Sequence, residues 1–217
     1  MRKIETADGQ ALRDMFSAAT AWLEKSVPDI DALNVFPVPD GDTGTNMLLT
    51  IRSAVEEAYR APDHGAAAVS EAMAKGALMG ARGNSGVILS QILKGLAKGL
   101  AKKEIFTGKD FSDAYLQASK MAYKGLSNPV EGTILTVIRE AAKAGEEQVN
   151  NNGDNLVSVM EAIVDKANKS LANTPNLLPV LKDAGVVDAG GQGLYTILEG
   201  ALRYLRGEGE QMQFRKP

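Results

Sequence analysis

Apolar residues along this chain recur mostly at the spacing of an amphipathic helix. From Leu12 to Leu23 they fall three or four residues apart, which predicts a first helix over residues 9–25, ended by Val27-Pro28. The same spacing predicts helices over residues 45–59, 66–79 and 111–124, around residues 87–96, 134–138 and 156–167, and over residues 177–182 and 194–205. Residues 173–176, which include Pro175, are expected to end the helix that begins near residue 156.

The alternation of apolar and polar residues that marks a strand is absent throughout, so we expect an all-α protein. No fixed-period repeat stands out either. The roughly seven to nine predicted helices are therefore expected to form one bundle.

The connections between the predicted helices fall into two kinds. If residues 177–182 form a short excursion, the other helices make an up-and-down bundle in which alternate connections meet at the same end. One set contains carboxylates, glycines and small hydroxyl residues, and its members are residues 40–46, 80–86, 129–133 and 188–193. The other set, around Pro62, Gly108 and Gly153, consists of ordinary polar turns. This segregation predicts a functional site at one end of the bundle.

The segment of residues 34–46, NVFPVPDGDTGTN, carries the clearest chemistry. Asp40 and Asp42 provide the carboxylate oxygens that Mg²⁺ prefers, and Mg²⁺ is often held by one or two carboxylates together with substrate phosphates. Residues 43–46 precede an apolar helical pattern, where free N–H groups favour a phosphate. A plain Asp-Gly turn with Thr45 as a helix cap is the alternative interpretation. The pattern does not fit an EF-hand, because Ile51 stands where the closing glutamate belongs.

Four helix starts that point into one region would sum their positive ends there. A polyphosphate with bound Mg²⁺ satisfies both the helix starts and the carboxylates. Two other nucleotide-binding patterns are excluded. No Gly-Lys-Ser/Thr follows Gly80, so a Walker A loop is absent, and Thr196 occupies the place of the third glycine of a dinucleotide-binding fingerprint.

Composition narrows the class of protein. The 217 residues are 44% hydrophobic and 24% charged with a net charge of −3, which gives no footprint for nucleic acid or an anionic membrane. The absence of cysteine excludes disulfides and thiolate chemistry. A signal peptide and a membrane-spanning run are also missing. We therefore expect a cytoplasmic protein with no nucleic acid partner and no membrane insertion. The single histidine, His64, is expected to be a solvated turn residue.

Four segments together resemble a known family. They are NVFPVPDGDTGTN at residues 34–46, GARGNSGVILS at 80–90, PVEGTI at 129–134 and VDAGGQG at 187–193. In this order they resemble the N-terminal ATP-binding domain of bacterial fatty acid kinases, which shares a superfamily with the nucleotide-binding subunit of dihydroxyacetone kinase. The resemblance implies a barrel-like bundle of about eight antiparallel helices with Mg-ATP at one end. It covers residues 1–207 as an ATP-binding kinase domain and leaves residues 208–217 as a linker or tail towards further domains.

The resemblance also implies roles for individual residues. Asp40 and Asp42 would ligate two Mg²⁺ ions, and Asn34 would replace a third aspartate that dihydroxyacetone kinases carry at the position of Val35. Arg82 is a candidate for stabilising the transferred charge. The implied nucleotide contacts are Thr43, Gly44, Thr45, Asn46, Ala81, Gly83, Asn84, Ser85, Gly86, Thr133, Asp188, Ala189 and Gly190.

The activity implied is transfer of the γ-phosphoryl group of ATP to a fatty acid carboxylate, presented by a separate acyl-binding protein, to give an acyl-phosphate. A carboxylate is ionised at neutral pH and needs no general base. Two alternatives stay open: a nucleotide-binding subunit of a dihydroxyacetone-type kinase, and an ATP-binding module without turnover of its own. We expect the chain to bind ATP but to need further domains and the acyl-binding partner for efficient transfer.

Overall fold

The structure is a computed structural model, and it describes residues 4–208. This part of the chain forms nine helices and two short strands. In chain order they are β1 (Thr6–Asp8), α1 (Gly9–Ala32), α2 (Thr43–Arg60), α3 (Ala66–Gly80), α4 (Gly83–Gly99), β2 (Ile105–Thr107), α5 (Gly108–Lys124), α6 (Ile134–Asn152), α7 (Leu156–Leu177), α8 (Pro179–Ala184) and α9 (Ala189–Leu205).

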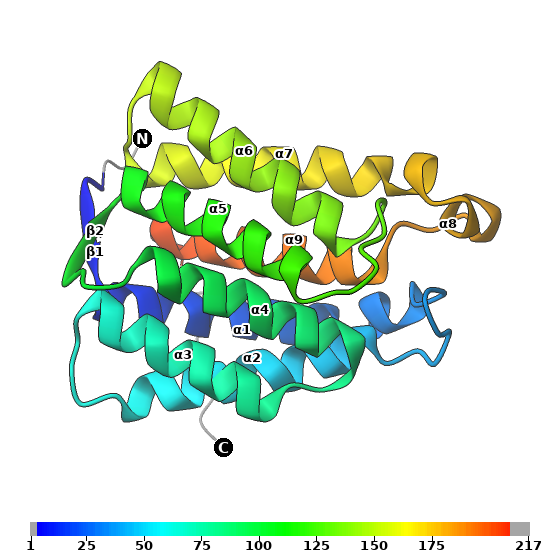
Figure 1. Cartoon of the computed structure of the whole chain (residues 1–217), viewed down its shortest axis with the longest axis horizontal. Helices are drawn as coiled ribbons and strands as arrows, with labels where there is room; N and C mark the ends of the chain where they lie inside the picture. Colours follow the sequence, from blue (N-terminus) through cyan, green and yellow to red (C-terminus); the bar gives the residue numbers. More distant parts are fainter. Residues whose placement is uncertain (1–3, 209–217) are drawn as a thin grey trace.

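The long helices close into a ring. Each of them packs against the next along the chain, and α9 returns to pack against both α7 and α1 (Figure 1). The short α8 projects from one end of the bundle as an excursion between α7 and α9. The predicted all-α, barrel-like bundle is therefore confirmed. Most of the predicted tail, residues 209–217, lies outside the described residues.

The interior of the ring is filled by apolar side chains from all the long helices. Leu12, Ile51, Leu93, Val137 and Ile197 are among the side chains with at most 2% of their surface exposed. Glycine lets some helices approach closely: a Cβ at Gly95 of α4 would lie 2.4 Å from the Cα of Ala118 on α5. The apolar periodicity of the sequence thus corresponds to one core.

Two predicted helix ends were wrong. The first helix does not stop at Pro28 but continues to Ala32, because Ile30 beyond the proline is fully buried and keeps the last turns packed. In the same way α7 continues past Pro175 to Leu177. Tertiary packing outweighs the hydrogen bond that each proline removes.

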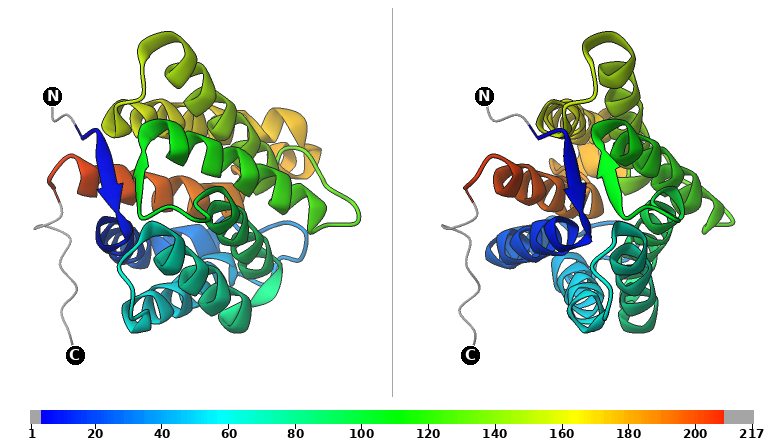
Figure 2. Two further views of the ribbon diagram at one scale, coloured as in Figure 1. Left: turned by 60° about the vertical axis from the view of Figure 1, so that its left-hand side comes forward. Right: turned by 90° about the vertical axis from the view of Figure 1, so that its left-hand side faces the viewer.

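One small two-stranded sheet was not predicted from the sequence, and it leaves the all-α class unchanged. β1 and β2 pair antiparallel, with Ala7 opposite Phe106, at the end of the bundle away from α8 (Figure 2). Three residues per strand are too few for alternation to stand out in a sequence. Phe106 is fully buried, and its ring centroid lies 5.0 Å from that of Phe111, so the sheet closes this end of the core. We call this end of the bundle the sheet end.

None of the helices within residues 4–208 combines the length and apolar character needed to cross a membrane.

Candidate functional site

The connections that precede α2, α4, α6 and α9 meet at the end of the bundle opposite the sheet. Together they line a cleft of about 600 Å³, at the right-hand end in Figure 1. Eleven of the residues singled out from the sequence line it: Asn34, Asp40, Asp42, Thr43, Asn46, Gly83, Asn84, Ser85, Thr133, Asp188 and Gly190. The predicted convergence of alternate helix starts is therefore present, and we call this end the cleft end.

The loop between α1 and α2 is held from within by Asn34. The side-chain amide of this buried residue donates to the carbonyl of Val38 at 3.1 Å, and its Oδ1 accepts the N–H of Asp42 at 3.2 Å. One lone pair of Oδ1 is thus engaged, and the second is what remains for a cation. The metal-ligand role of Asn34 stays a prediction. Its structural role, which is to hold the loop before α2 through these hydrogen bonds, is seen in the structure.

Asp40 and Asp42 both line the cleft, and within residues 4–208 neither carboxylate forms an ion pair. Asp42 occupies the N-cap position of α2, yet among the described residues its side chain makes no capping hydrogen bond. The pKa of Asp40 is raised by partial desolvation, and further by a hydrogen bond to Asp42 and the charge of that residue. Two neighbouring carboxylates of this kind favour a bound cation, which would relieve their repulsion.

The cap that Asp42 does not provide comes from Asp31, a residue that the sequence analysis missed. Its carboxylate accepts the N–H of Thr45 at 3.0 Å and the hydroxyl of Thr45 at 2.7 Å. Asp31 lies in the part of α1 beyond Pro28, so the wrong helix end concealed it. Because Asp31 satisfies the start of α2, Asp42 is left free to face the cleft.

The start of α4 is open towards the cleft. In the part of the chain that the structure describes, no side chain caps this helix, and Gly83, Asn84 and Ser85 line the cleft. Gly83 has a φ of 60°, and a Cβ there would lie 2.4 Å from Nδ2 of Asn46, so this position requires glycine. The Ser85 hydroxyl donates to the carbonyl of Thr43 at 3.4 Å, which joins the starts of α4 and α2. Uncapped N–H groups at a helix start favour an anion.

Asp188 joins the other two helix starts. Its Oδ2 accepts the N–H of Gly191 in α9 at 2.8 Å and that of Ile134 in α6 at 2.9 Å. Only 5% of the residue is exposed. Burial raises the pKa of Asp188 to about 6, although the two N–H donors act in the opposite direction. This cap also explains why α9 begins at Ala189, five residues before the predicted start at Leu194.

Six predicted site residues fall outside the cleft lining, namely Gly44, Thr45, Ala81, Arg82, Gly86 and Ala189. The Thr45 side chain is engaged by Asp31. Arg82 is exposed, and its guanidinium donates to the carbonyl of Ala81 at 3.1 Å. Gly86 is needed for packing, since a Cβ there would lie 2.4 Å from Oγ1 of Thr50. Ligand contacts by these six residues remain predictions.

The cleft has an apolar wall that the sequence analysis did not identify. It consists of Leu126 and Val130 from the connection between α5 and α6 and of Ile134 and Leu135 at the start of α6. Five further apolar residues line the cleft on the side of α2 and α4, namely Phe36, Pro37, Val38, Val87 and Ile88. Most of these residues lie in the segments that resemble the family, but their apolar side chains gave no sign in the sequence of a place in the cleft lining. Asn128, in the connection between α5 and α6, also lines the cleft.

The donors for a metal ion are limited to the two aspartates and nearby amides and hydroxyls. Residues 4–208 contain no group of three or more His, Cys, Asp or Glu side chains placed to hold a metal. Such a donor set fits Mg²⁺ bound by one or two carboxylates with ligand phosphates completing the shell, and it does not fit an all-protein cage.

The structure is thus a helical barrel with carboxylates and open helix starts at one end, and comparison with known proteins places the chain within a family. The model of the DAK2 domain matches residues 37–203, so the chain belongs to this dihydroxyacetone kinase-like family. The predicted superfamily is thereby confirmed.

Several curated relatives are proteins of Staphylococcus aureus. Uncharacterized proteins of the strains bovine RF122 and USA300 are each 46% identical to this chain over 205 residues. The alignment covers 94% of this chain and 37% of each relative. The chain therefore spans just over a third of the length of the relatives it matches.

Proposed function

We propose that the cleft binds Mg-ATP and that this chain is the ATP-binding domain of a kinase whose phosphoryl acceptor is a fatty acid carboxylate. The observation that carries the proposal is the meeting, on one cleft, of two unneutralised carboxylates and an uncapped helix start. Membership of a dihydroxyacetone kinase-like family supports the same reading.

The two sides of the cleft suggest how the nucleotide lies. The phosphates take the side of α2 and α4, where N–H groups at the start of α4 face Asp40 and Asp42 across the space for a cation. The base takes the apolar wall formed by Leu126, Val130 and Ile134. A volume of about 600 Å³ falls within the range usual for small-molecule sites.

The chemistry asked of the protein is positioning and charge neutralisation. An acceptor carboxylate oxygen forms a bond to the γ-phosphorus while the bond to the β,γ-bridging oxygen breaks, which yields acyl-phosphate and ADP. Bound Mg²⁺ would supply neutralisation of the phosphate charge. Asp40 and Asp42 hold the cations, the start of α4 orients the phosphates, and Arg82, beside Gly83, keeps its proposed part in stabilising the transferred charge.

In this proposal, the phosphoryl acceptor is bound by other domains and not by this one. The relatives are much longer than the stretch that aligns with this chain. We place docking of the acyl-binding protein in further domains. The isolated chain then binds ATP without efficient transfer. A dihydroxyacetone-type acceptor is the second candidate, because it is the substrate that the family description indicates.

Calorimetric titration with a non-hydrolysable ATP analogue tests the nucleotide proposal. We expect saturable binding with Mg²⁺ and at least about tenfold weaker binding in its absence, since the phosphates would then face two bare carboxylates. Absence of binding under both conditions would contradict the proposal.

A second assay addresses the acceptor. The 217-residue chain is incubated with ATP, Mg²⁺ and an acyl-loaded carrier protein, and in parallel with dihydroxyacetone. We expect little product from the chain alone and acyl-phosphate when it is supplied within a full-length relative. Robust acyl-phosphate formation by the isolated chain would show that no further domain is required. Phosphorylation of dihydroxyacetone without formation of acyl-phosphate would favour the second candidate.

A further inference from the structure

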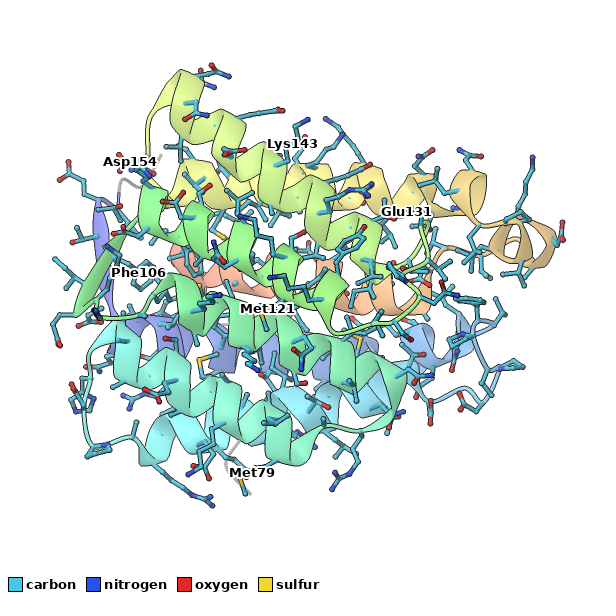
Figure 3. The ribbon with its side chains drawn as sticks, viewed as in Figure 1. Met79, Phe106, Met121, Glu131, Lys143 and Asp154 are labelled. Carbon is cyan, nitrogen blue, oxygen red and sulfur yellow. The ribbon has the colours of Figure 1, made fainter. Side chains whose placement is uncertain are left out.

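The apolar wall of the cleft depends on a surface connection. Residues 125–133 join α5 to α6 and contribute Leu126, Asn128, Val130 and Thr133 to the lining. A surface connection without regular structure keeps one shape only if its polar groups are satisfied. Glu131 lies near the end of this connection that leads into α6, within a segment singled out from the sequence (Figure 3). It is not among the residues that line the cleft.

The carboxylate of Glu131 is tied to both neighbouring helices. Its Oε1 accepts the phenol O–H of Tyr123 on α5 at 2.9 Å and the guanidinium of Arg139 on α6 at 2.7 Å. Its Oε2 accepts the hydroxyl of Thr136 at 2.5 Å. Burial, with the hydrogen bond to Glu131, raises the pKa of Tyr123 to about 12, so the phenol remains a donor at neutral pH.

Glu131 keeps its charge at neutral pH. Partial burial acts to raise its pKa, but the hydrogen bonds from Thr136 and Tyr123 and the charge of Arg139 outweigh it and leave the pKa below the ordinary value. Charge-assisted hydrogen bonds of this kind are stronger than neutral ones.

The hydrogen-bond network extends from Glu131 to residues that line the cleft. The buried Thr136 hydroxyl, which donates to Glu131, accepts the N–H of Gly132 at 2.8 Å. The hydroxyl of Thr133 donates to the carbonyl of Val130 at 2.7 Å. Gly132 has a φ of 81°, and a Cβ there would lie 2.8 Å from that of Leu178, so the connection also fits closely against the end of α7. Val130 and Thr133 therefore have little freedom while this network is intact.

We propose that Glu131 is a positioning residue, which fixes Val130 and Thr133 in the cleft wall and thereby sets affinity for the base half of the bound nucleotide. The inference rests on the proposed function, because it assigns the base to the apolar wall. Glu131 itself touches no ligand. Its loss weakens contacts to the base and leaves the phosphate side, formed by α2 and α4, unchanged.

The test compares two ligands on matched variants. Calorimetry measures the binding of a Mg-ATP analogue and of Mg-tripolyphosphate to the unmodified chain, to Glu131→Ala and to Glu131→Gln. We expect Glu131→Ala to bind the ATP analogue about tenfold more weakly and tripolyphosphate within about twofold of the unmodified chain. Glu131→Gln retains one acceptor oxygen and should lie in between.

Two further variants complete the design. Asp113→Ala removes an exposed carboxylate that pairs with Lys109 at 2.8 Å near the other end of α5, and it should change neither affinity. Tyr123→Phe removes one donor to Glu131 while keeping the ring, and it should weaken the ATP analogue about threefold. If Glu131→Ala fails to fold, Glu131→Gln and Tyr123→Phe carry the measurement.

Each outcome has a distinct meaning. Equal binding of the ATP analogue by the unmodified chain and the Glu131 variants overturns the inference alone. An equal loss for both ligands also overturns it, because Glu131 would then support the whole domain. If the unmodified chain binds neither ligand, the proposed function fails and the inference fails with it.

Discussion

The two ends of the bundle treat their helix starts differently. At the sheet end, α1, α5 and α7 are each capped by a side chain of their own N-cap residue, and Thr107 forms a full capping box with Asp110. At the cleft end, neither α2 nor α4 is capped by its N-cap residue within the described part of the chain. At the sheet end the polar side chains stabilise the helix starts, whereas at the cleft end carboxylates and N–H groups remain available for a ligand.

The cleft end is itself divided. On one side, α6 and α9 are capped by Thr133 and Asp188, and the Asp188 carboxylate serves both starts. On the other side, Asp40, Asp42 and the start of α4 remain open. This difference supports the proposal that the charged ligand group lies on the side of α2 and α4, whereas the apolar wall lies at the start of α6.

The largest expected effect comes from Asp42→Asn. We expect binding of a Mg-ATP analogue to weaken by about a thousandfold, or ~4 kcal/mol, because one of the two proposed cation ligands is lost. Stability against urea should stay equal or rise, since a like-charge repulsion is removed. Calorimetry and urea unfolding check both statements. As a control, Asp110→Asn at the sheet end should lower stability without changing affinity, and loss of the fold in Asp42→Asn would point to a structural role instead.

A smaller effect concerns pH and Asp188. The folded pKa of about 6 lies above the ordinary value of 3.8, so the folded state binds the proton more tightly than the unfolded state. The stabilisation is therefore fully present below about pH 4 and is lost as pH rises through about 6, a change of about 2–3 kcal/mol. Asp188→Asn can still accept both N–H bonds and should lack this component. Urea unfolding of both proteins between pH 4 and 7 measures it, and parallel curves would contradict the assignment.

Asp31→Ala tests the cap that frees Asp42. Loss of the two bonds to Thr45 should cost about 1 kcal/mol of stability. It should also weaken Mg-dependent nucleotide binding about tenfold, because the start of α2 carries Asp42. Unfolding and calorimetry on one preparation measure both quantities. A loss of stability with unchanged affinity would show that the α2 start does not need this support.

Thr107→Ala is the matched change at the sheet end and the smallest expected effect. It breaks the capping box of α5 and should cost about 1 kcal/mol of stability. Nucleotide affinity should stay within about twofold, because the cleft lies at the opposite end of the bundle. A clear fall in affinity would mean that the two ends are coupled, contrary to the comparison drawn above.

The sequence alone determined the all-α class, the bundle of about eight long helices and the end of the bundle at which the candidate site lies. These follow from local patterns: apolar residues at helical spacing specify each helix, and short connections make neighbours antiparallel, so unusual residues on alternate connections must meet. Eleven of the residues singled out by these patterns or by the family resemblance line the cleft.

Only the tertiary structure decided how those residues are used. Asp31 caps a helix that begins a loop away, Asp188 reaches Ile134 across 54 positions of sequence, and Phe106 pairs with the chain start to close the far end. Burial also carries α1 past Pro28 and raises the pKa of Asp188. Contacts between distant segments depend on how the helices pack, and the local periodicity of the sequence does not predict them.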